Sequence, residues 1–467
     1  MTALSQSYTH HFIETLRLST PVIIAQLGLV MMGVIDNIMI GDIGYHFLSA
    51  ASLANSIFFI LTVIGIGITF AISPLVAEAS AAGRDAQCGL YLRQGVWVGI
   101  GSGLFIALLI AITTFFLPLM GQPEQDVALA TPYLHIINLS VLPMMLFQVF
   151  KQFSDGLELT RPAMVITLIA LAFNVVANYI LIYGWGIIPA LELNGAGIGT
   201  FMSRTLMMIL MIAYVSMNKR FQRYGVRMRW REFSWTTIRK IYSIGLPSGL
   251  QLFFEVGAFG GAVIMIGWIG PEQRSAHQIA INMASISYMF VTGIAAGATI
   301  RVGAALGRKD FREMRLAGTT GLVLGAGFML VAAGIFVLGK DWLPTLYVSE
   351  EQVLSIAARL VLLAALFQLF DGIQAVAIGI LRGIQDVNVP TVIAFISYWL
   401  IGLPVGYVLA FEAGMGVDGV WWGFVVCLTI AAIALTYRFI RKTQHLQGFP
   451  PTPPDAQEEQ KLEEALP

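Results

Sequence analysis

Three acidic residues stand alone inside long apolar stretches, and they are the residues of this chain best suited to chemistry. Glu255 is the only charge between residues 241 and 271, while Asp36 and Asp371 are similarly isolated. A charged carboxylate in the middle of a membrane-spanning helix costs roughly 2.5–3.5 kcal/mol on insertion scales, so it usually faces a cavity and has a task. The alternative is a position at the lipid headgroups, which weighs most for Asp36, a few residues from the outer end of its stretch.

A buried carboxyl group can exchange one positive partner for another. Removal from water disfavours its ionised form, so it can take up a proton near neutral pH. The neutral acid tolerates a dry pocket, and the ionised acid attracts a cation. Each of the three acids therefore predicts a binding site for a proton, a metal cation or an organic cation.

Neutral oxygen ligands accompany Asp36 in the first half of the chain. Asn174 and Asn178 are four residues apart, on one face of a predicted helix, and Thr200 lies in the next one. Carboxylate, amide and hydroxyl oxygens suit Na⁺ or a proton relay, although each Asn could instead make an interhelical hydrogen bond. Arg204 lies within the same stretch as Thr200; it either snorkels outward or pairs with an intramembrane acid.

The composition places these residues in a membrane protein. The chain is 57% hydrophobic and 12% charged, against about 25% charged residues in soluble domains, and its mean hydropathy is +0.78. With 27 basic and 27 acidic residues, nucleic acid is not an expected partner. Only two cysteines are present, in different segments, so no disulfide or metal–thiolate site is predicted. We expect no cleavable signal peptide, because the first long apolar run starts after Arg17 and reads as a retained helix.

Apolar runs bounded by charges or turn residues predict about twelve spans. They cover approximately 15–40, 51–78, 90–117, 127–150, 162–188, 195–217, 240–268, 276–304, 315–339, 352–381, 391–411 and 416–438. Among the Lys and Arg residues outside these spans, only Arg274 and Lys340 fall on the side opposite the termini. Because cytoplasmic loops are rich in Lys and Arg, both termini are predicted to be cytoplasmic.

The two halves of the chain resemble each other at an offset near 226 residues. Pro21 matches Pro247, and Gly67 matches Gly293. An even number of spans in each half makes this a parallel repeat, whose halves usually rock about a central site. We therefore divide the chain into an N-terminal lobe (1–217), a basic cytoplasmic loop (218–239), a C-terminal lobe (240–445) and a disordered, Pro-rich and acidic tail (446–467).

Several motifs together resemble the multidrug and toxic compound extrusion (MATE) family, most closely its NorM branch, over about residues 12–440. They are Ala276-His277-Gln278-Ile279-Ala280-Ile281-Asn282, Arg301-Val302-Gly303 with Leu306-Gly307 and Asp310, Leu381-Arg382-Gly383-Ile384-Gln385-Asp386 with Pro390, and Pro74 with Glu78 and Gly83. The resemblance implies an all-α polytopic membrane protein with about twelve transmembrane helices in two pseudo-symmetric six-helix lobes around a V-shaped cavity.

The resemblance also implies a function, that of a secondary antiporter. It would export small cationic, lipophilic drugs and dyes in exchange for inward H⁺ or Na⁺, as a monomer in the lipid bilayer of a bacterial cytoplasmic membrane, without a cofactor. Functional acids of the family match Asp36, Glu255 and Asp371, and the residues matching Asn174, Asn178 and Thr200 support the first. Na⁺ would bind either at Glu255 and Asp371 or at Asp36 with those three residues.

Two departures from the family bear on the coupling ion. Some branches have Asp where this chain has Asn178, and Phe367 offers no oxygen one turn before Asp371. The second departure favours protons over Na⁺ in the second lobe, or else a site formed by Glu255 and Asp371 alone. Some large apolar residues could line an adaptable cavity, although for any single one packing or lipid contact is the plainer interpretation. They are Phe253, Phe254, Met265, Met283, Met289 and Phe290.

Other function classes are weighed against transport of cations. A lipid-linked-oligosaccharide flippase of the same superfamily would need basic residues in its cavity, whereas the isolated residues here are acidic apart from Arg204. An ion channel would pass ions without obligatory exchange. An enzyme is not predicted, because the sequence has no P-loop and no Ser/His/Asp or metalloprotease pattern.

Overall fold

The chain folds into a bundle of long helices. The computed structural model describes residues 3–186, 189–227 and 232–446. Within these residues, twelve helical segments are long and apolar enough to cross a membrane, as the apolar runs predict. Helices satisfy their own backbone hydrogen bonds, which is what allows such runs to lie in hydrocarbon. The predicted fold class is confirmed. The tail predicted at 446–467 lies, from residue 447 onward, outside the described residues.

The first half contributes six spans, two of which are interrupted. Its helices are α1 (Ala3–Ile43), α2 (Tyr45–Thr69), α3 (Ile72–Ala81), α4 (Asp85–Phe116), η1 (Leu117–Met120), α5 (Glu124–Leu139), α6 (Val141–Gly156), α7 (Arg161–Tyr183), α8 (Glu192–Met217) and η2 (Lys219–Tyr224). The second span breaks between α2 and α3, shortly before Pro74, and the fourth breaks between α5 and α6, shortly before Pro143. Proline has no backbone N–H to donate, which accounts for breaks at these points.

The second half contributes the other six spans. Its helices are α9 (Trp235–Ile269), α10 (Pro271–Gly307), α11 (Phe311–Gly339), η3 (Leu343–Leu346), α12 (Glu351–Gly383), α13 (Asn388–Phe395), the π-helix η4 (Ile396–Gly402), α14 (Leu403–Tyr407), the π-helix η5 (Val408–Glu412) and α15 (Val417–Leu446). Helix α9 begins five residues before the predicted 240, because the Ser234 hydroxyl accepts the backbone N–H of Thr237 and caps an earlier first turn.

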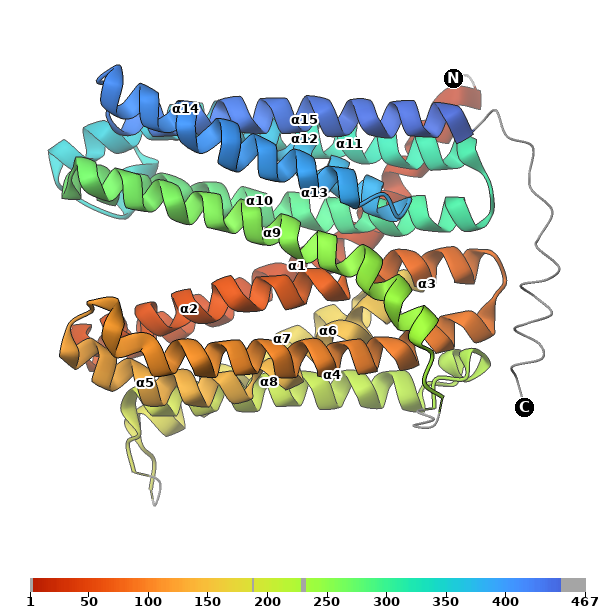
Figure 1. The fold of residues 1–467 in the computed structure, drawn as a ribbon, viewed down its shortest axis with the longest axis horizontal. Helices are drawn as coiled ribbons and strands as arrows, with labels where there is room; N and C mark the ends of the chain where they lie inside the picture. Colours follow the sequence, from red (N-terminus) through yellow and green to blue (C-terminus); the bar gives the residue numbers. More distant parts are fainter. Residues whose placement is uncertain (1–2, 187–188, 228–231, 447–467) are drawn as a thin grey trace.

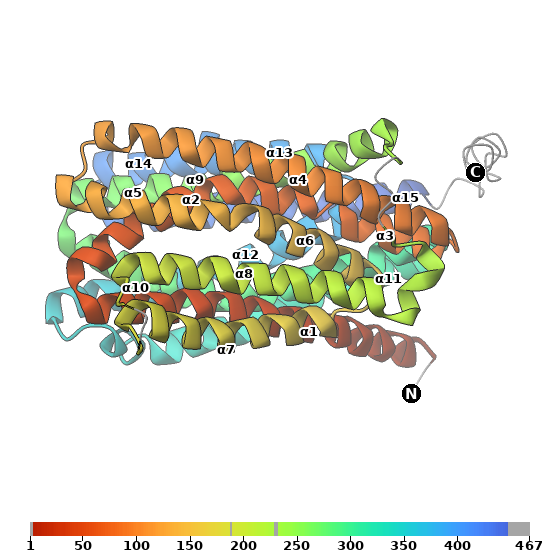
Figure 2. The same ribbon diagram turned by 90° about the horizontal axis from the view of Figure 1, so that it is seen from below.

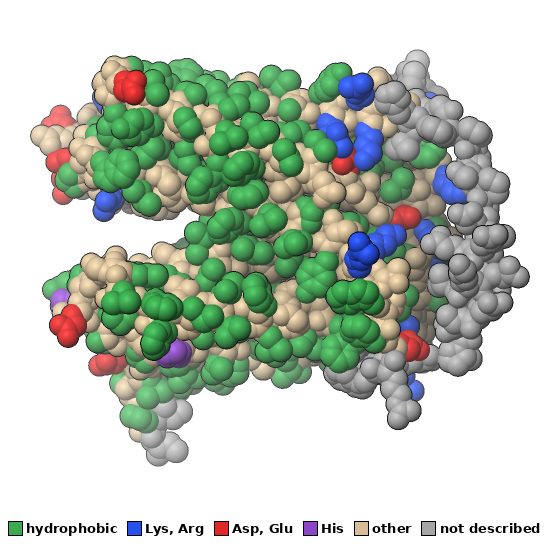
Figure 3. Space-filling model, viewed as in Figure 1, with side chains coloured by type: hydrophobic (Ala, Val, Ile, Leu, Met, Phe, Trp, Pro, Cys, Tyr) green, Lys and Arg blue, Asp and Glu red, His purple; other side chains and the backbone are tan. Residues whose placement is uncertain are grey.

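The helices form two lobes with a cleft between them. In Figure 1, α2 to α8 lie below and α10 to α15 above, and Figure 2 shows the same bundle from below. The space-filling view in Figure 3 shows a cleft that opens at the left. The first turn of α1 and the last described turns of α15 lie at the opposite end, where most Lys and Arg side chains of this face gather.

Two helix crossings join the lobes at the closed end of the cleft. Helix α1 packs on α10 of the second lobe, and α9 packs on α2 of the first. Gly67 and Gly249 meet at the α2–α9 crossing, where a Cβ on Gly67 would lie 2.4 Å from the Cα of Gly249. At the α1–α10 crossing, Gly293 packs on Ile23. Each pair becomes the other on adding 226 residues, so the crossings are repeat mates.

Candidate functional site

Asp36 lies in a polar cluster that three helices of the first lobe build. Its side chain, on α1, is 8% exposed. Asn178 on α7 donates through Nδ2 to Asp36 Oδ1 at 2.5 Å, and the hydroxyl of Thr200 on α8 donates to Oδ2 at 3.0 Å. Each carboxylate oxygen thus has a neutral donor. The structure brings together Asp36, Asn178 and Thr200, which lie more than 140 residues apart in sequence.

Asn174 and Arg204 complete the surroundings of this cluster. Asn174, one helical turn before Asn178, is fully buried, and its amide atoms have no hydrogen-bond partner among the described residues. Arg204 donates from Nη1 to the hydroxyl of Ser140 at 2.7 Å and lies 4.7 Å above the ring centre of Phe58. Neither alternative for Arg204 is what the structure has: the residue turns inward, and it makes no ion pair with an acid among the described residues.

The second lobe holds a different cluster, with two acids. Glu255 on α9 is 6% exposed and Asp371 on α12 is 4% exposed. The hydroxyl of Tyr288 on α10 donates to Glu255 Oε1 at 2.7 Å. The two carboxyl groups lie within electrostatic range of each other. Because like charges this close disfavour joint ionisation, the pair can hold an extra proton or a cation between them.

Polar groups without partners surround Asp371. Tyr398 on η4 donates to Gln374 Oε1 at 3.1 Å. Asp371 Oδ1 and Gln374 Nε2 are buried and have no hydrogen-bond partner among the described residues. A buried polar atom without a partner is costly, so this cluster is incomplete in a way that a proton, a cation or a water molecule could remedy. Its residues come from α9, α10, α12 and η4, and they are Glu255, Tyr288, Asp371, Gln374 and Tyr398.

Sequence reasoning missed several members of these clusters. Tyr288, Gln374 and Tyr398 were not singled out in the second lobe, nor were Ser140 and Phe58 near Arg204. One signal was available for Gln374, which lies three residues after Asp371 and so on the same helical face. The others lie on different helices from the residues they contact, and hydropathy carries no information on how helices face one another.

The six candidate cavity residues have varied surroundings. Met265 and Met283 are buried in an apolar cluster of the second lobe. Phe253 and Phe254 are half-buried neighbours on α9, and the Phe254 ring centre lies 5.0 Å from that of Phe395. Met289 is half-buried, while Phe290 stacks on Phe328 of α11. The cavity role of these residues stays a prediction.

The two clusters are suited to singly charged ions. The three acids make no ion pairs among the described residues; pairs elsewhere include Lys151 with Asp155 and Arg438 with Asp386. No group of three or more His, Cys, Asp or Glu side chains in the described part of the chain could hold a metal ion together. One or two carboxylates with amide and hydroxyl oxygens are donors for a proton or for Na⁺ rather than for a transition metal.

Comparison with known proteins supports this description. The MatE family model matches residues 21–180 and 247–408, one segment in each lobe. A probable multidrug resistance protein NorM from Agrobacterium fabrum is 34% identical over 441 residues, covering 93% of this chain and 95% of that protein. The multidrug resistance protein NorM of Vibrio cholerae is 33% identical over 428 residues, covering 91% and 94%.

Solved structures share the fold at lower identity. The chain superposes on the eukaryotic MATE transporter AtDTX14 with a TM-score of 0.85 at 20% identity, covering 94% of this chain and 98% of that one. It superposes on a multidrug resistance MATE family transporter in an outward-facing conformation with a TM-score of 0.86 at 18% identity, covering 94% and 97%.

Proposed function

This chain belongs to the MATE family of membrane transporters, and on that premise we propose that it is a multidrug efflux antiporter. It exports small organic cations, of the kind found among lipophilic drugs and dyes, in exchange for inward H⁺ or Na⁺. Relatives named as multidrug resistance proteins support the export of drugs. The family also excludes an enzymatic role, so no catalytic residue is assigned.

The observation that carries the proposal is a pair of buried acid clusters without fixed counter-ions, one in each lobe. Asp36 accepts only neutral donors, and the Glu255–Asp371 pair has an unpartnered oxygen among the described residues. Acids that were merely structural would be neutralised by a Lys or Arg, as Asp155 is by Lys151. Instead these acids stay available for a mobile positive partner.

The position of the acids favours coupling to motion. Asp36 lies on α1 and Glu255 on α9, and these two helices pack across the boundary between the lobes. A change in the charge of either acid therefore acts on a helix that joins the lobes. A cation that enters down its gradient and binds there could displace the drug, and each elementary charge moved inward gains about 2.3 kcal/mol per 100 mV.

The loop charges support an orientation for this multi-pass protein. Lys and Arg side chains gather at the end that holds the chain ends (Figure 3), so we place both termini in the cytoplasm and the cleft opening on the outer face. The bacterial relatives favour a bacterial cytoplasmic membrane. The two lobes form a complete cleft within one chain, which is consistent with a monomer.

Efflux of a fluorescent organic cation from proteoliposomes tests the proposal. A Na⁺ gradient and a pH gradient are imposed separately on the wild type, and one of them should drive efflux. Asp36→Asn, Glu255→Gln and Asp371→Asn should each slow that efflux, roughly 5- to 150-fold for a coupling term of 1–3 kcal/mol. Asp341→Asn is the matched control, since Asp341 is an exposed acid at the end of the molecule where the cleft opens.

The outcome also decides between this function and the oligosaccharide flippase. Wild-type rates in all three variants, or efflux that neither gradient drives, would remove the antiport proposal. Flipping of a lipid-linked oligosaccharide that is unaffected by all three substitutions would support the alternative instead. A current carried without any drug, in proportion to the ion gradient, would indicate a channel.

A further inference from the structure

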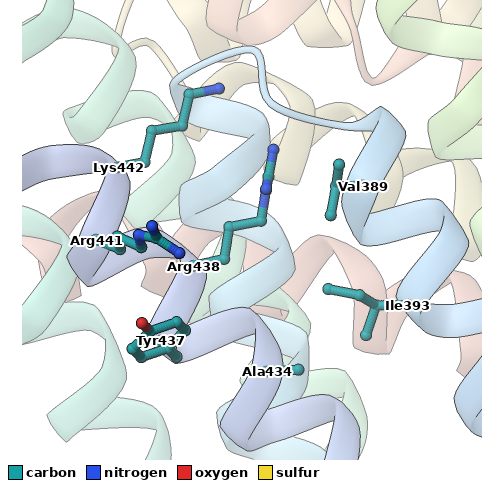
Figure 4. A pocket seen from close by; sticks show the side chains of 7 residues that line it. All are labelled: Val389, Ile393, Ala434, Tyr437, Arg438, Arg441 and Lys442. Atoms are coloured by element: carbon teal, nitrogen blue, oxygen red, sulfur yellow. The ribbon is translucent and has the colours of Figure 1, made fainter. Parts of the chain in front are cut away.

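A basic pocket opens on the outer surface of the second lobe, away from the acid clusters. It has a volume of about 490 Å³ and lies between α13 and the last turns of α15. Figure 4 shows Val389 and Ile393 of α13 facing the basic side chains across it. The lining is apolar toward the middle of the membrane and basic toward the end with the termini. It consists of Val389, Ile393, Ala434, Tyr437, Arg438, Arg441 and Lys442.

The pocket carries more positive charge than its one acidic neighbour can neutralise. Buried Asp386 accepts from Arg438 Nε at 2.7 Å and Nη2 at 3.0 Å, and it pairs with Lys442 Nζ at 3.2 Å. Arg441 is exposed and has no ion pair or hydrogen bond among the described residues. Three cations against one carboxylate leave a formal charge of about +2 at a surface that faces lipid.

The first lobe has a pocket at the repeat-related place, and it lacks this charge. Its volume is about 640 Å³, and it lies between α7 and α8. Arg161 and Val165 precede Val389 and Ile393 by 228 residues. The lining residues on α8 all precede those on α15 by 224, and they are Leu210, Ala213, Tyr214, Met217 and Asn218.

Shape is therefore common to both pockets, and charge is not. Where the second lobe has Arg438, Arg441 and Lys442, the first has Tyr, Met and Asn, and Arg161 is the single cation of its lining. The fold alone explains a groove between these helices twice. It does not explain three basic residues placed in only one of them, which points to a ligand.

We propose that the pocket of the second lobe binds an anionic phospholipid from the leaflet on the side of the termini. Guanidinium groups hold phosphate oxygens in a fork, and an ammonium group adds a point charge. Arg441 and Lys442 are free to contact the phosphate, while Arg438 is oriented by Asp386. Basic pockets between membrane helices on the cytoplasmic side bind anionic headgroups in this way.

The apolar lining fits the rest of such a lipid. Val389, Ile393 and Ala434 offer an apolar wall along which an acyl chain can lie, and Tyr437 is exposed beside them. Tyrosine is enriched at the level of the headgroups, where its ring is in lipid and its hydroxyl in water. The inference needs only the membrane-spanning fold, so its failure would leave the proposed antiport untouched.

Native mass spectrometry of the purified full-length protein measures the binding. Phosphatidylglycerol and phosphatidylcholine with the same acyl chains are titrated separately, and phosphatidylglycerol should bind more tightly. Arg441→Gln should weaken its binding roughly fivefold, and Arg441→Gln with Lys442→Gln roughly 30-fold, at about 1 kcal/mol for each basic residue. Arg161→Gln, in the pocket of the first lobe, is the matched control and should leave the affinity unchanged.

Transplanting the charge gives a second, independent readout. Met217→Arg with Asn218→Lys places basic residues in the first lobe at the positions that match Arg441 and Lys442. The protein should then retain one additional phosphatidylglycerol molecule. This variant keeps the Asp386 cluster intact, so it tests the proposal even if the variants of the second lobe prove unstable.

Three results would overturn the proposal. The first is equal affinity for phosphatidylglycerol and phosphatidylcholine, and the second is unchanged binding in the doubly substituted second lobe. The third is displacement of the lipid by millimolar inorganic phosphate alone, which would identify a site for the free anion instead.

Discussion

The two lobes treat their buried acids differently. In the first lobe, Asp36 is a single carboxylate whose two oxygens each accept a neutral hydrogen bond. In the second lobe, Glu255 and Asp371 share one cluster in which Tyr288 donates to Glu255, and one oxygen of Asp371 has no partner among the described residues. The first arrangement satisfies an ionised acid, and the second favours the arrival of a proton or a cation.

The acids also lie at different depths on equivalent helices. Adding the repeat offset to Asp36 gives Ala262, which is seven residues beyond Glu255 on α9. At 1.5 Å per residue this is a difference of about 10 Å along the helix axis. The clusters are therefore not copies inherited from the repeat, and each lobe has acquired its acid separately. Two sites that differ in depth and in acid count can act as two separate steps of one cycle.

A double-substitution cycle on efflux gives the largest expected effect. Glu255→Gln and Asp371→Asn belong to one cluster, so the double variant should be only slightly worse than the poorer single variant. Asp36→Asn combined with Asp371→Asn touches two separate clusters, and their effects on the efflux rate should multiply. With each single effect between about 5- and 150-fold, the second pair should approach complete loss of efflux.

The same proteoliposome assay, driven by the gradient that serves the wild type, measures all five proteins. Asp341→Asn in each background controls for changes in surface charge. Multiplying effects within the second lobe would mean that Glu255 and Asp371 act independently. A lack of additivity between Asp36 and Asp371 would mean that the two lobes form one shared site, and the contrast drawn here would fail.

The sequence predicted the fold and the acids better than the completed clusters. Charge isolation found Asp36, Glu255 and Asp371, because a charge in an apolar run is visible without a structure. The helical spacing of Asn174 and Asn178 placed them on one face, and the structure seats Asn178 against Asp36. The helix start at Trp235 was missed, because an aqueous first turn capped by Ser234 has no apolar signature.

Contacts between helices were the part that the sequence could not supply. Tyr288 reaches Glu255 across 33 positions, and Arg204 reaches Ser140 across 64. Such pairs depend on the rotation of each helix about its axis, which apolar composition leaves open when all faces are hydrophobic. The repeat offset was legible, yet its consequence at the Gly67–Gly249 crossing required coordinates.

The two inter-lobe crossings offer a second test of how the lobes differ. A Cβ at Gly67 would meet the backbone of Gly249 at 2.4 Å, and backbone cannot rotate away. A Cβ at Gly293 would meet the Cγ1 of Ile23 at 2.3 Å, and that side chain can change rotamer. Gly67→Ala should therefore destabilise the protein by about 1–3 kcal/mol through overpacking. Gly293→Ala should cost less than about 1 kcal/mol, since alanine also favours the helix.

Thermal unfolding of the purified protein in detergent measures this difference as a change in melting temperature. Ile23→Ala removes the clashing atom, so it should restore Gly293→Ala to the stability of Ile23→Ala alone. No such rescue exists for Gly67, whose neighbour is already glycine. Equal destabilisation by the two glycine substitutions would show that both crossings are equally rigid.

The smallest expected effect comes from removing one hydroxyl donor in each lobe. Tyr288→Phe takes away the one hydrogen bond to Glu255 seen among the described residues, whereas Thr200→Val leaves Asp36 with its bond from Asn178. At about 1 kcal/mol for a typical hydrogen bond, efflux should fall about fivefold in Tyr288→Phe and about twofold in Thr200→Val. Initial efflux rates at saturating drug compare the two. A larger loss from Thr200→Val would mean that the well-satisfied acid, and not the frustrated pair, limits the rate of exchange.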